Sequence, residues 1–167
     1  MFMPELQHFA AWLHATAPSQ WVRYWPWTWP ICETLHFIGL SLLVGIVGML
    51  DLRLMGFLKQ IPLPALKQML PYGIAGFVIN LITGGIFIVG APEQYVTNLA
   101  FWMKMLFLVI SGVNVLYFET TQGQTVLTIG PDEPMPTPFK IAGAVSLLSW
   151  FMVLYWGRML PFLGNAF

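Results

Sequence analysis

Four long apolar segments constrain this chain more than any other feature of its sequence. They cover residues 31–50, 72–90, 99–118 and 139–157. Each is close to the roughly 20 residues that an α-helix needs to cross about 30 Å of hydrocarbon. Only 8% of the 167 residues are charged, against about 25% in an average soluble domain. The sequence therefore predicts an all-α membrane protein, a four-transmembrane-helix bundle that occupies residues 1–167 as a single domain.

A short amphipathic segment precedes the first apolar run. Residues 3–16 carry Leu6, Phe9 and Leu13 at helical spacing, which is typical of a helix that lies in the membrane interface. Glu5 comes early, and no basic region precedes an unbroken apolar core, so the pattern of a cleavable signal peptide is missing. We expect this interfacial helix to remain in the mature protein.

Aromatic residues cluster between this segment and the first apolar run, in and just before the stretch WPWTWP. Tryptophan and tyrosine are enriched at the depth of the lipid headgroups, and two prolines prevent a continuous helix across the junction. We expect an interfacial anchor made of four tryptophans: Trp21, Trp25, Trp27 and Trp29. The pattern leaves open whether one or two of them also line a pocket beside His36.

The distribution of basic residues predicts the orientation. Arg53, Lys59 and Lys67 follow the first apolar run, whereas only Arg23 precedes it. By the positive-inside rule the first loop is cytoplasmic, so we expect a multi-pass protein of the bacterial inner membrane with both termini on the periplasmic side. Arg158, at the far end of the last apolar run, departs from this pattern.

Several functional classes do not fit the composition. The formal net charge is zero and no basic run exists, so a nucleic-acid partner is not expected. The single cysteine, Cys32, excludes an intramolecular disulfide and a cysteine-based metal cluster. No serine has a base-orienting set around it, which argues against an enzyme with a serine or cysteine nucleophile. The expected partners are the lipid bilayer and other membrane-protein subunits.

The first apolar run carries two ionisable residues, Glu33 and His36, in the pattern E-x-x-H. This spacing places both side chains on one helix face, and an ionisable group inside a membrane helix is costly unless it is paired or hydrated. We predict that Glu33 holds one ring N–H of His36 and leaves the other nitrogen free for a ligand. The alternative is that both residues only pair with Lys104 or with backbone near the interface.

The third apolar run contains Lys104, with Ser111 and Asn114 on the same helical face. This pattern predicts an inward polar stripe that brings Lys104 to the depth of the E-x-x-H pair. The candidate cofactor-binding residues are therefore His36, Glu33, Lys104 and Asn114, with His36 as the metal ligand. E-x-x-H is also half of a di-iron motif, but no second copy is present.

Other polar and small residues are expected to be structural. The polar ones are Asp51, Arg53, Asn80 and Arg158. An ion pair and headgroup contacts would explain the first two. The small ones form a stripe on the first transmembrane helix and a group near Asn80 on the second, where they would let helices approach closely: Ser41, Gly45, Gly48, Gly73, Gly76 and Gly84. The loop over residues 120–138 is expected to form a small β-hairpin.

Three stretches carry a family resemblance: ETLHFIGLSLLVGIVGMLDLRLMG, NLITGG and FWMKMLFLVISGVNVLYF. They resemble a family of small bacterial four-helix membrane proteins of uncharacterised function, over nearly the whole chain. More distantly, the chain is similar to membrane proteins of the copper-resistance D type and to the HemJ-type protoporphyrinogen oxidase. That likeness concerns His36, Lys104 and Asn114, and the oxidase family implies a b-type haem and porphyrin oxidation.

Three functional hypotheses follow. The first is a haem b, another tetrapyrrole or a metal ion near the non-cytoplasmic face, in electron transfer or redox support. There His36 would be the axial ligand, Glu33 its partner, and Lys104 a second ligand or the counter-ion of a propionate. The second is a non-catalytic accessory subunit that packs against a larger membrane complex. The third is transport of copper or another small ion. An absorption spectrum separates the first hypothesis from the other two.

Overall fold

The computed structural model describes residues 3–130 and 133–163, which form seven α-helices and one short 3₁₀-helix. The helices in chain order are α1 (Met3–His14), α2 (Ala17–Tyr24), α3 (Thr28–Leu54), α4 (Leu63–Gly90), α5 (Pro92–Val96), α6 (Leu99–Gln122), η1 (Thr125–Thr128) and α7 (Thr137–Leu163). No strand occurs in these two ranges. The all-α prediction is confirmed, whereas the β-hairpin expected over residues 120–138 is wrong where the structure describes that loop, because it forms η1.

Four of these helices are long and apolar enough to cross a membrane: α3, α4, α6 and α7, with 24 to 28 residues each. At 1.5 Å per residue such helices are about 36–42 Å long, which exceeds the roughly 30 Å of a hydrocarbon core. The prediction of four membrane-crossing helices in one bundle is confirmed, and the protein is a multi-pass membrane protein. Each helix extends beyond its predicted range, and α4 starts at Leu63 and continues through Pro71, which lies just before the predicted range of 72–90.

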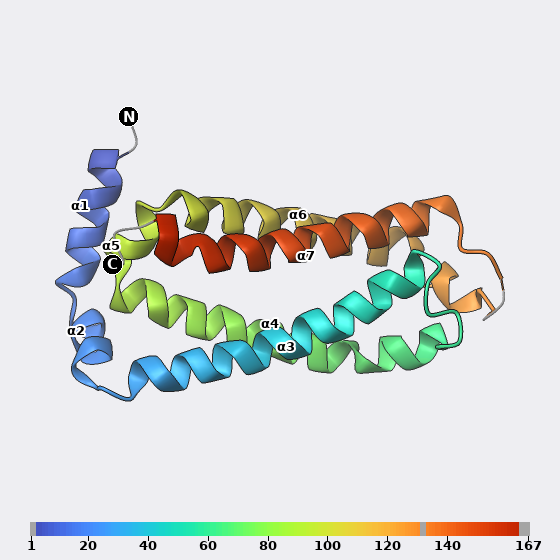
Figure 1. Cartoon of the computed structure of the whole chain (residues 1–167), viewed down its shortest axis with the longest axis horizontal. Helices are drawn as coiled ribbons and strands as arrows, with labels where there is room; N and C mark the ends of the chain where they lie inside the picture. Colours follow the sequence, from blue (N-terminus) through green and yellow to red (C-terminus); the bar gives the residue numbers. More distant parts are fainter. Residues whose placement is uncertain (1–2, 131–132, 164–167) are drawn as a thin grey trace.

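The bundle consists of two antiparallel hairpins (Figure 1). Helix α3 packs along α4, helix α6 packs along α7, and the two hairpins meet where α3 contacts α7. Helices α3 and α4 of the first hairpin approach closely at Gly39 and Gly76. A Cβ atom on Gly76 would lie 2.5 Å from the carbonyl oxygen of Gly39, and one on Gly39 would lie 2.7 Å from that of Gly76. Small residues at this crossing let the two backbones touch.

The expected packing roles of the small residues are only partly correct. Gly73 packs on Ile46 and Gly76 on Gly39, as the group on the second transmembrane helix predicted. On α3, however, Ser41 and Gly45 are exposed, and a Cβ atom on Gly45 would meet nothing within 4 Å. Ser41 and Gly45 therefore face outward, and Gly48 faces α7, where its Cβ atom would lie 3.9 Å from Leu147. The close contact with α4 is made by Gly39 instead.

The hydrophobic core is concentrated at the end of the bundle where α3 turns into α4 and α6 into α7. It joins both hairpins to η1 and the loop after it. Its buried members are Leu50, Leu54, Leu63, Leu66, Phe118, Val126, Met135, Phe139 and Ala142. This end ties the hairpins together, and the residues of the candidate site lie toward the other end.

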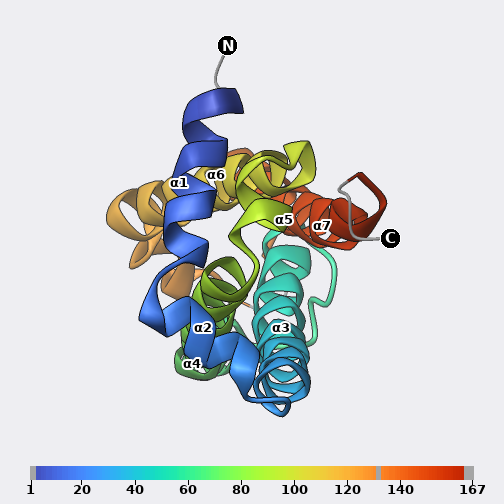
Figure 2. The same ribbon diagram turned by 90° about the vertical axis from the view of Figure 1, so that its left-hand side faces the viewer.

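Two short helices, α1 and α2, cross the opposite end of the bundle (Figure 2). The sequence predicted one interfacial helix over residues 3–16, but the chain bends after His14 and starts α2 at Ala17. Arg23 of α2 donates a hydrogen bond to the backbone oxygen of His14 at 2.8 Å, which joins the two helices. Helix α1 also contacts α5.

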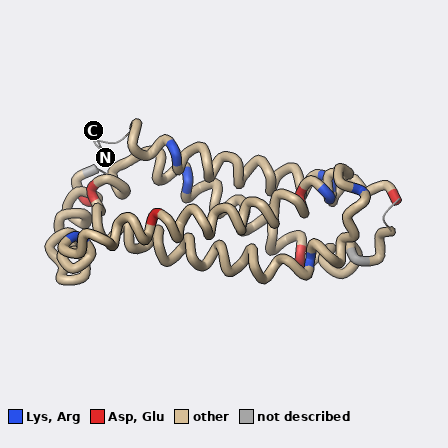
Figure 3. The backbone as a smooth tube through the Cα atoms, turned by 60° about the horizontal axis from the view of Figure 1, so that its bottom comes forward, with Lys and Arg blue, Asp and Glu red and all other residues tan. Residues whose placement is uncertain are grey.

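Charged residues lie mainly toward the two ends of the bundle (Figure 3). Asp51 and Arg53 lie at the end with the hydrophobic core, where only 3% and 1% of their surface is exposed. The side chain of Arg53 donates from Nε to the carbonyl oxygen of Ile61 at 3.0 Å, and Ser146 of α7 lies close enough to the Asp51 carboxyl to interact with it. The prediction that both side chains contact lipid headgroups is wrong, because the protein itself covers Asp51 and Arg53.

Candidate functional site

The side chain of His36 points from α3 toward α4. Its Nδ1 atom lies 2.7 Å from the hydroxyl oxygen of Thr83. The same hydroxyl oxygen lies 2.8 Å from the carbonyl oxygen of Ile79, one turn earlier in α4. Thr83 is only 2% exposed, so no solvent competes for its hydroxyl. The sequence prediction that Glu33 holds the ring of His36 is wrong, because Thr83 is the partner.

These two distances indicate which nitrogen of the neutral imidazole carries the hydrogen. A hydroxyl has one hydrogen to donate and two lone pairs that accept. The contact with Ile79 joins two oxygens, and only the Thr83 hydroxyl can supply the hydrogen between them. The His36 contact must then have its hydrogen on Nδ1, which donates to Thr83. In the neutral ring this leaves Nε2 without a hydrogen and with its lone pair available.

Nothing in the described parts of the chain hydrogen-bonds to Nε2 of His36. The ring is half-buried and packs against Phe87, with 5.6 Å between ring centroids. Phe87 in turn packs against Trp29 at 5.2 Å. A Cβ atom on Gly84 would lie 4.0 Å from Cε1 of His36, so the glycine leaves room beside the ring. The result is an imidazole with one fixed nitrogen, one available nitrogen and aromatic neighbours.

The four tryptophans of the expected anchor divide into two groups. Trp21, Trp25 and Trp27 are 51–65% exposed, and the rings of the first two stack with centroids 6.2 Å apart. Trp29 is half-buried against Phe87 and Gly90. It is therefore the tryptophan that lies next to the aromatic neighbour of the histidine.

Lys104 lies at the same depth in the bundle as the histidine. Helices α3 and α7 run antiparallel, and they touch where Gly143 meets the carbonyl oxygen of Asp51. Gly157 follows Gly143 by fourteen residues along α7, and Phe37 precedes Asp51 by fourteen residues along α3. Gly157 therefore lies at about the depth of Phe37 and its neighbour His36. A Cβ atom on Gly157 would lie 3.8 Å from Nζ of Lys104.

The charge of Lys104 also acts on the histidine. The ammonium group is close enough to interact electrostatically with the His36 ring. No hydrogen bond or ion pair connects Lys104 to any residue within 3–130 or 133–163. A half-buried, unpaired ammonium group in a membrane helix is unfavourable unless an anion or water reaches it. The structure thus brings two predicted site residues, His36 and Lys104, to one level.

Glu33 has a different neighbour. Its side chain is exposed and lies near the half-buried Tyr95 of α5. Burial and the nearby Glu33 carboxylate raise the pKa of Tyr95 to about 12. The E-x-x-H pair therefore divides between two environments, with the carboxylate at α5 and the imidazole at α4.

Asn114 does not belong to this site. Its Nδ2 atom donates to the carbonyl oxygen of Ala142 at 3.0 Å, which joins α6 to α7. Ten residues separate it from Lys104, or about 15 Å along the helix. The prediction that Asn114 contributes to the cofactor site with His36 is wrong, because the hydrogen bond holds it against α7 far from the ring. Arg158, expected to be structural, is exposed and lies over the ring of Phe162 at 5.3 Å.

Comparison with known proteins identifies the family. A model of a family of unknown function, DUF6644, matches residues 28–163, which run from the start of α3 to the end of α7. The chain belongs to the DUF6644 family. No curated protein and no solved structure matches the chain. All of the residues around His36 fall within the DUF6644 match, whereas α1 and α2 precede it.

The DUF6644 chain has few residues that could hold a bare metal ion. Among the described residues, no group of three or more His, Cys, Asp or Glu side chains comes together. A metal ion that already carries four ligands from a macrocycle needs only one from the protein, and a single imidazole nitrogen can supply it. The Nε2 atom of His36 fits that requirement better than it fits an isolated ion.

Two surface grooves of the DUF6644 chain lie away from His36. One of about 370 Å³ lies between α6 and α7 beside Asn114, and one of about 420 Å³ lies between α3 and α7 beside Asp51. Neither is lined by His36.

Four contributors to the site were missed in the sequence: Thr83, Phe87, Tyr95 and Gly157. Thr83 stands out in retrospect, since it is one of two polar residues in NLITGG, with Asn80, within a largely apolar helix. The other three are ordinary membrane-helix or loop residues, and only their neighbours in space give them a role.

Proposed function

We propose that this DUF6644 chain binds a haem or another tetrapyrrole through Nε2 of His36 and serves electron transfer or redox support in the bacterial inner membrane. One observation carries the proposal: Nδ1 of His36 donates to a threonine hydroxyl whose own hydrogen is already committed to Ile79. Axial histidines in proteins are held in the same way, with the second ring nitrogen hydrogen-bonded so that the first can bind the metal. When bound, such a group supplies reversible one-electron chemistry.

Two neighbours of His36 support the proposal. The rings of Phe87 and Trp29 provide apolar contact for a flat macrocycle. The unpaired ammonium group of Lys104 is at the correct depth to neutralise a carboxylate on the ligand. The positive-inside rule would put this end of the bundle on the periplasmic side, because Lys59 and Lys67 lie at the other end, where α3 turns into α4.

The test is an absorption spectrum of the protein purified from its membrane, with and without dithionite. We expect a Soret band that shifts on reduction. The band should be lost in His36→Ala and kept in His8→Ala, because His8 is exposed on α1. A protein with neither a Soret band nor metal by elemental analysis, even after incubation with haem, would show that the proposal is wrong.

A further inference from the structure

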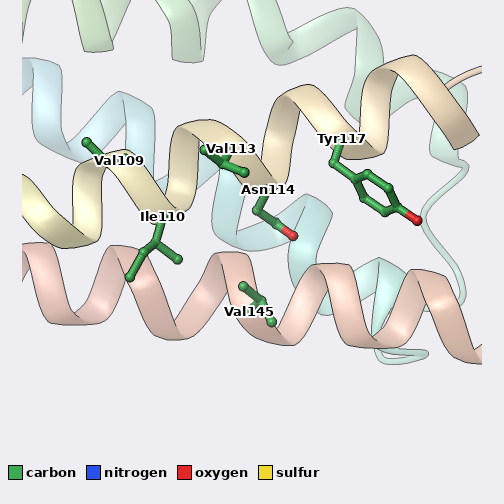
Figure 4. A pocket seen from close by; sticks show the side chains of 6 residues that line it. All are labelled: Val109, Ile110, Val113, Asn114, Tyr117 and Val145. Atoms are coloured by element: carbon green, nitrogen blue, oxygen red, sulfur yellow. The ribbon is translucent and has the colours of Figure 1, made fainter.

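The polar side chain of Asn114 lines a groove on the outer surface of the bundle. It lies in the groove of about 370 Å³ between α6 and α7 (Figure 4), whose other lining residues are Val109, Ile110, Val113, Tyr117 and Val145. Along α6, Asn114 is about 22 Å from the first residue and about 12 Å from the last. The amide therefore lies within the hydrocarbon region, in a groove otherwise walled almost entirely by apolar groups.

The hydrogen bonds of this amide are incomplete. A carboxamide has two N–H donors and an oxygen that accepts. One N–H of Asn114 donates to the carbonyl oxygen of Ala142 at 3.0 Å. No residue of the described chain bonds to its second N–H or to Oδ1. A polar group without a partner in hydrocarbon costs free energy, so a partner from outside the chain would stabilise this face.

Helix α6 is also the transmembrane helix that the chain itself covers least. In the most apolar 18-residue stretch of α6, 11% of the residues are buried, against 22–33% in the corresponding stretches of the other three helices. Val109 and Val113, on the rim of the groove, are 61% and 62% exposed. β-Branched side chains such as these lose little rotamer freedom when another helix packs on them.

We propose that this groove is a dimerisation surface, in which α6 of a second copy of the chain packs and the two Asn114 amides bond to each other. The free N–H and the free Oδ1 make the amide self-complementary. Across a twofold axis each amide can donate to the oxygen of the other, so both unmet groups are satisfied by one identical partner. A lipid tail could fill the groove, but it has no donor for Oδ1.

Cysteine cross-linking in proteoliposomes tests the contact. Cys32 is first replaced by Ala, and Val113→Cys is then introduced with Asn114 intact, so the result does not depend on an Asn114 variant. The matched control is Ile74→Cys on α4, whose parent residue is 60% exposed. We expect mild oxidation to give a covalent dimer with Val113→Cys and none with Ile74→Cys. No dimer at Val113, or an equal dimer at both positions, would overturn the proposal.

Energy transfer between labelled copies, measured over a range of protein-to-lipid ratios, tests the amide. Asn114→Ala should raise the dimer dissociation constant about tenfold, as expected for losing two reciprocal interhelical hydrogen bonds. Leu81→Ala, at a 65% exposed position on α4, should leave the constant unchanged. A protein that stays monomeric at every ratio, or that binds only a lipid or a different protein in this groove, would also overturn the proposal. So would a dimer that Asn114→Ala does not weaken.

Discussion

Nδ1 of His36 donates to the hydroxyl of Thr83 across 2.7 Å, which links α3 to α4 between residues 47 positions apart. Because the Thr83 hydroxyl hydrogen goes to Ile79, the bond fixes which ring nitrogen carries the proton. The availability of Nε2 therefore depends on one hydroxyl on the neighbouring helix.

Replacing Thr83 by Val keeps the shape of the side chain and removes the acceptor. We expect the His36 imidazole to become a mixture of its two tautomers, whereas the parent protein has hydrogen on Nδ1 only. Nitrogen-15 NMR of histidine-labelled protein measures this directly. Thr34→Val is the matched control, since Thr34 on α3 bonds only to its own helix, at Pro30. An unchanged tautomer in Thr83→Val would contradict the assignment.

The same substitution should weaken any ligand on Nε2. Loss of the partner of a ligating histidine typically lowers affinity by about 10–100-fold. We expect haem titrations of the purified protein to show a loss of this size for Thr83→Val and none for Thr34→Val. If both variants bind as the parent does, Thr83 does not support the site.

The contact between Gly39 and Gly76 should be sensitive to a single methyl group. In Gly76→Ala the new Cβ would lie 2.5 Å from the backbone oxygen of Gly39, so α3 and α4 must separate. Overpacking of this kind costs about 1–3 kcal/mol. We expect a lower free energy of unfolding, measured in detergent micelles or bicelles.

The control for this experiment is Gly45→Ala. Its Cβ atom would meet nothing within 4 Å, and alanine favours a helix over glycine by up to about 1 kcal/mol. We expect unchanged or slightly higher stability. Equal destabilisation of both variants would mean that Gly45 is also packed, as the small-residue stripe had predicted.

Gly39 and Gly45 of α3 show which part of the fold can be predicted from the sequence and which part cannot. The thickness of a bilayer sets the length of an apolar helix, so four runs of about 20 apolar residues were sufficient to predict four crossings. Small residues occur on more than one face of α3, at Gly39 as well as Ser41 and Gly45. Which face is covered depends on where α4 lies, and the sequence of α3 does not contain that information.

The candidate site was predictable to a similar extent. An ionisable residue in an apolar helix is conspicuous. His36 and Lys104 could therefore be identified from the free-energy cost of placing such side chains in a membrane. Their partners could not, because a local rule such as E-x-x-H considers only neighbours on the same helix. Thr83 is the partner from another helix, and Glu33 lies near Tyr95 on α5.

The two hairpins are joined near the hydrophobic core by Lys67. Its Nζ atom lies 3.1 Å from Oε2 of Glu119 and 2.8 Å from the carbonyl oxygen of Gly123. An exposed ion pair contributes about 0–1 kcal/mol, whereas a hydrogen bond from a charged group contributes about 1.5–3 kcal/mol. We expect Lys67→Met to reduce the free energy of unfolding clearly more than Glu119→Gln does, in chemical denaturation of both variants. Equal effects would assign the stabilisation to the ion pair alone.

The hydroxyl of Tyr95 reports on the position of Glu33. Burial and the carboxylate together raise its pKa to about 12, so the phenol stays neutral where an ordinary tyrosine, with a pKa near 10, begins to ionise. The unfolded chain then releases this proton first as the pH rises. The contribution of Tyr95 to stability is therefore complete below about pH 10 and is lost between about pH 10 and 12.

Glu33→Gln separates the two causes. Without the carboxylate the pKa of Tyr95 should fall, but burial should keep it above its usual value. The measurement is an ultraviolet titration of tyrosinate, with Tyr95→Phe subtracted so that only this side chain is followed. Glu33→Gln should leave the tautomer of His36 unchanged, because Thr83 holds that ring. If Glu33→Gln leaves the pKa of Tyr95 unchanged but alters the tautomer of His36, then Glu33 is the partner of the histidine. That result would contradict the arrangement described for α3, α4 and α5.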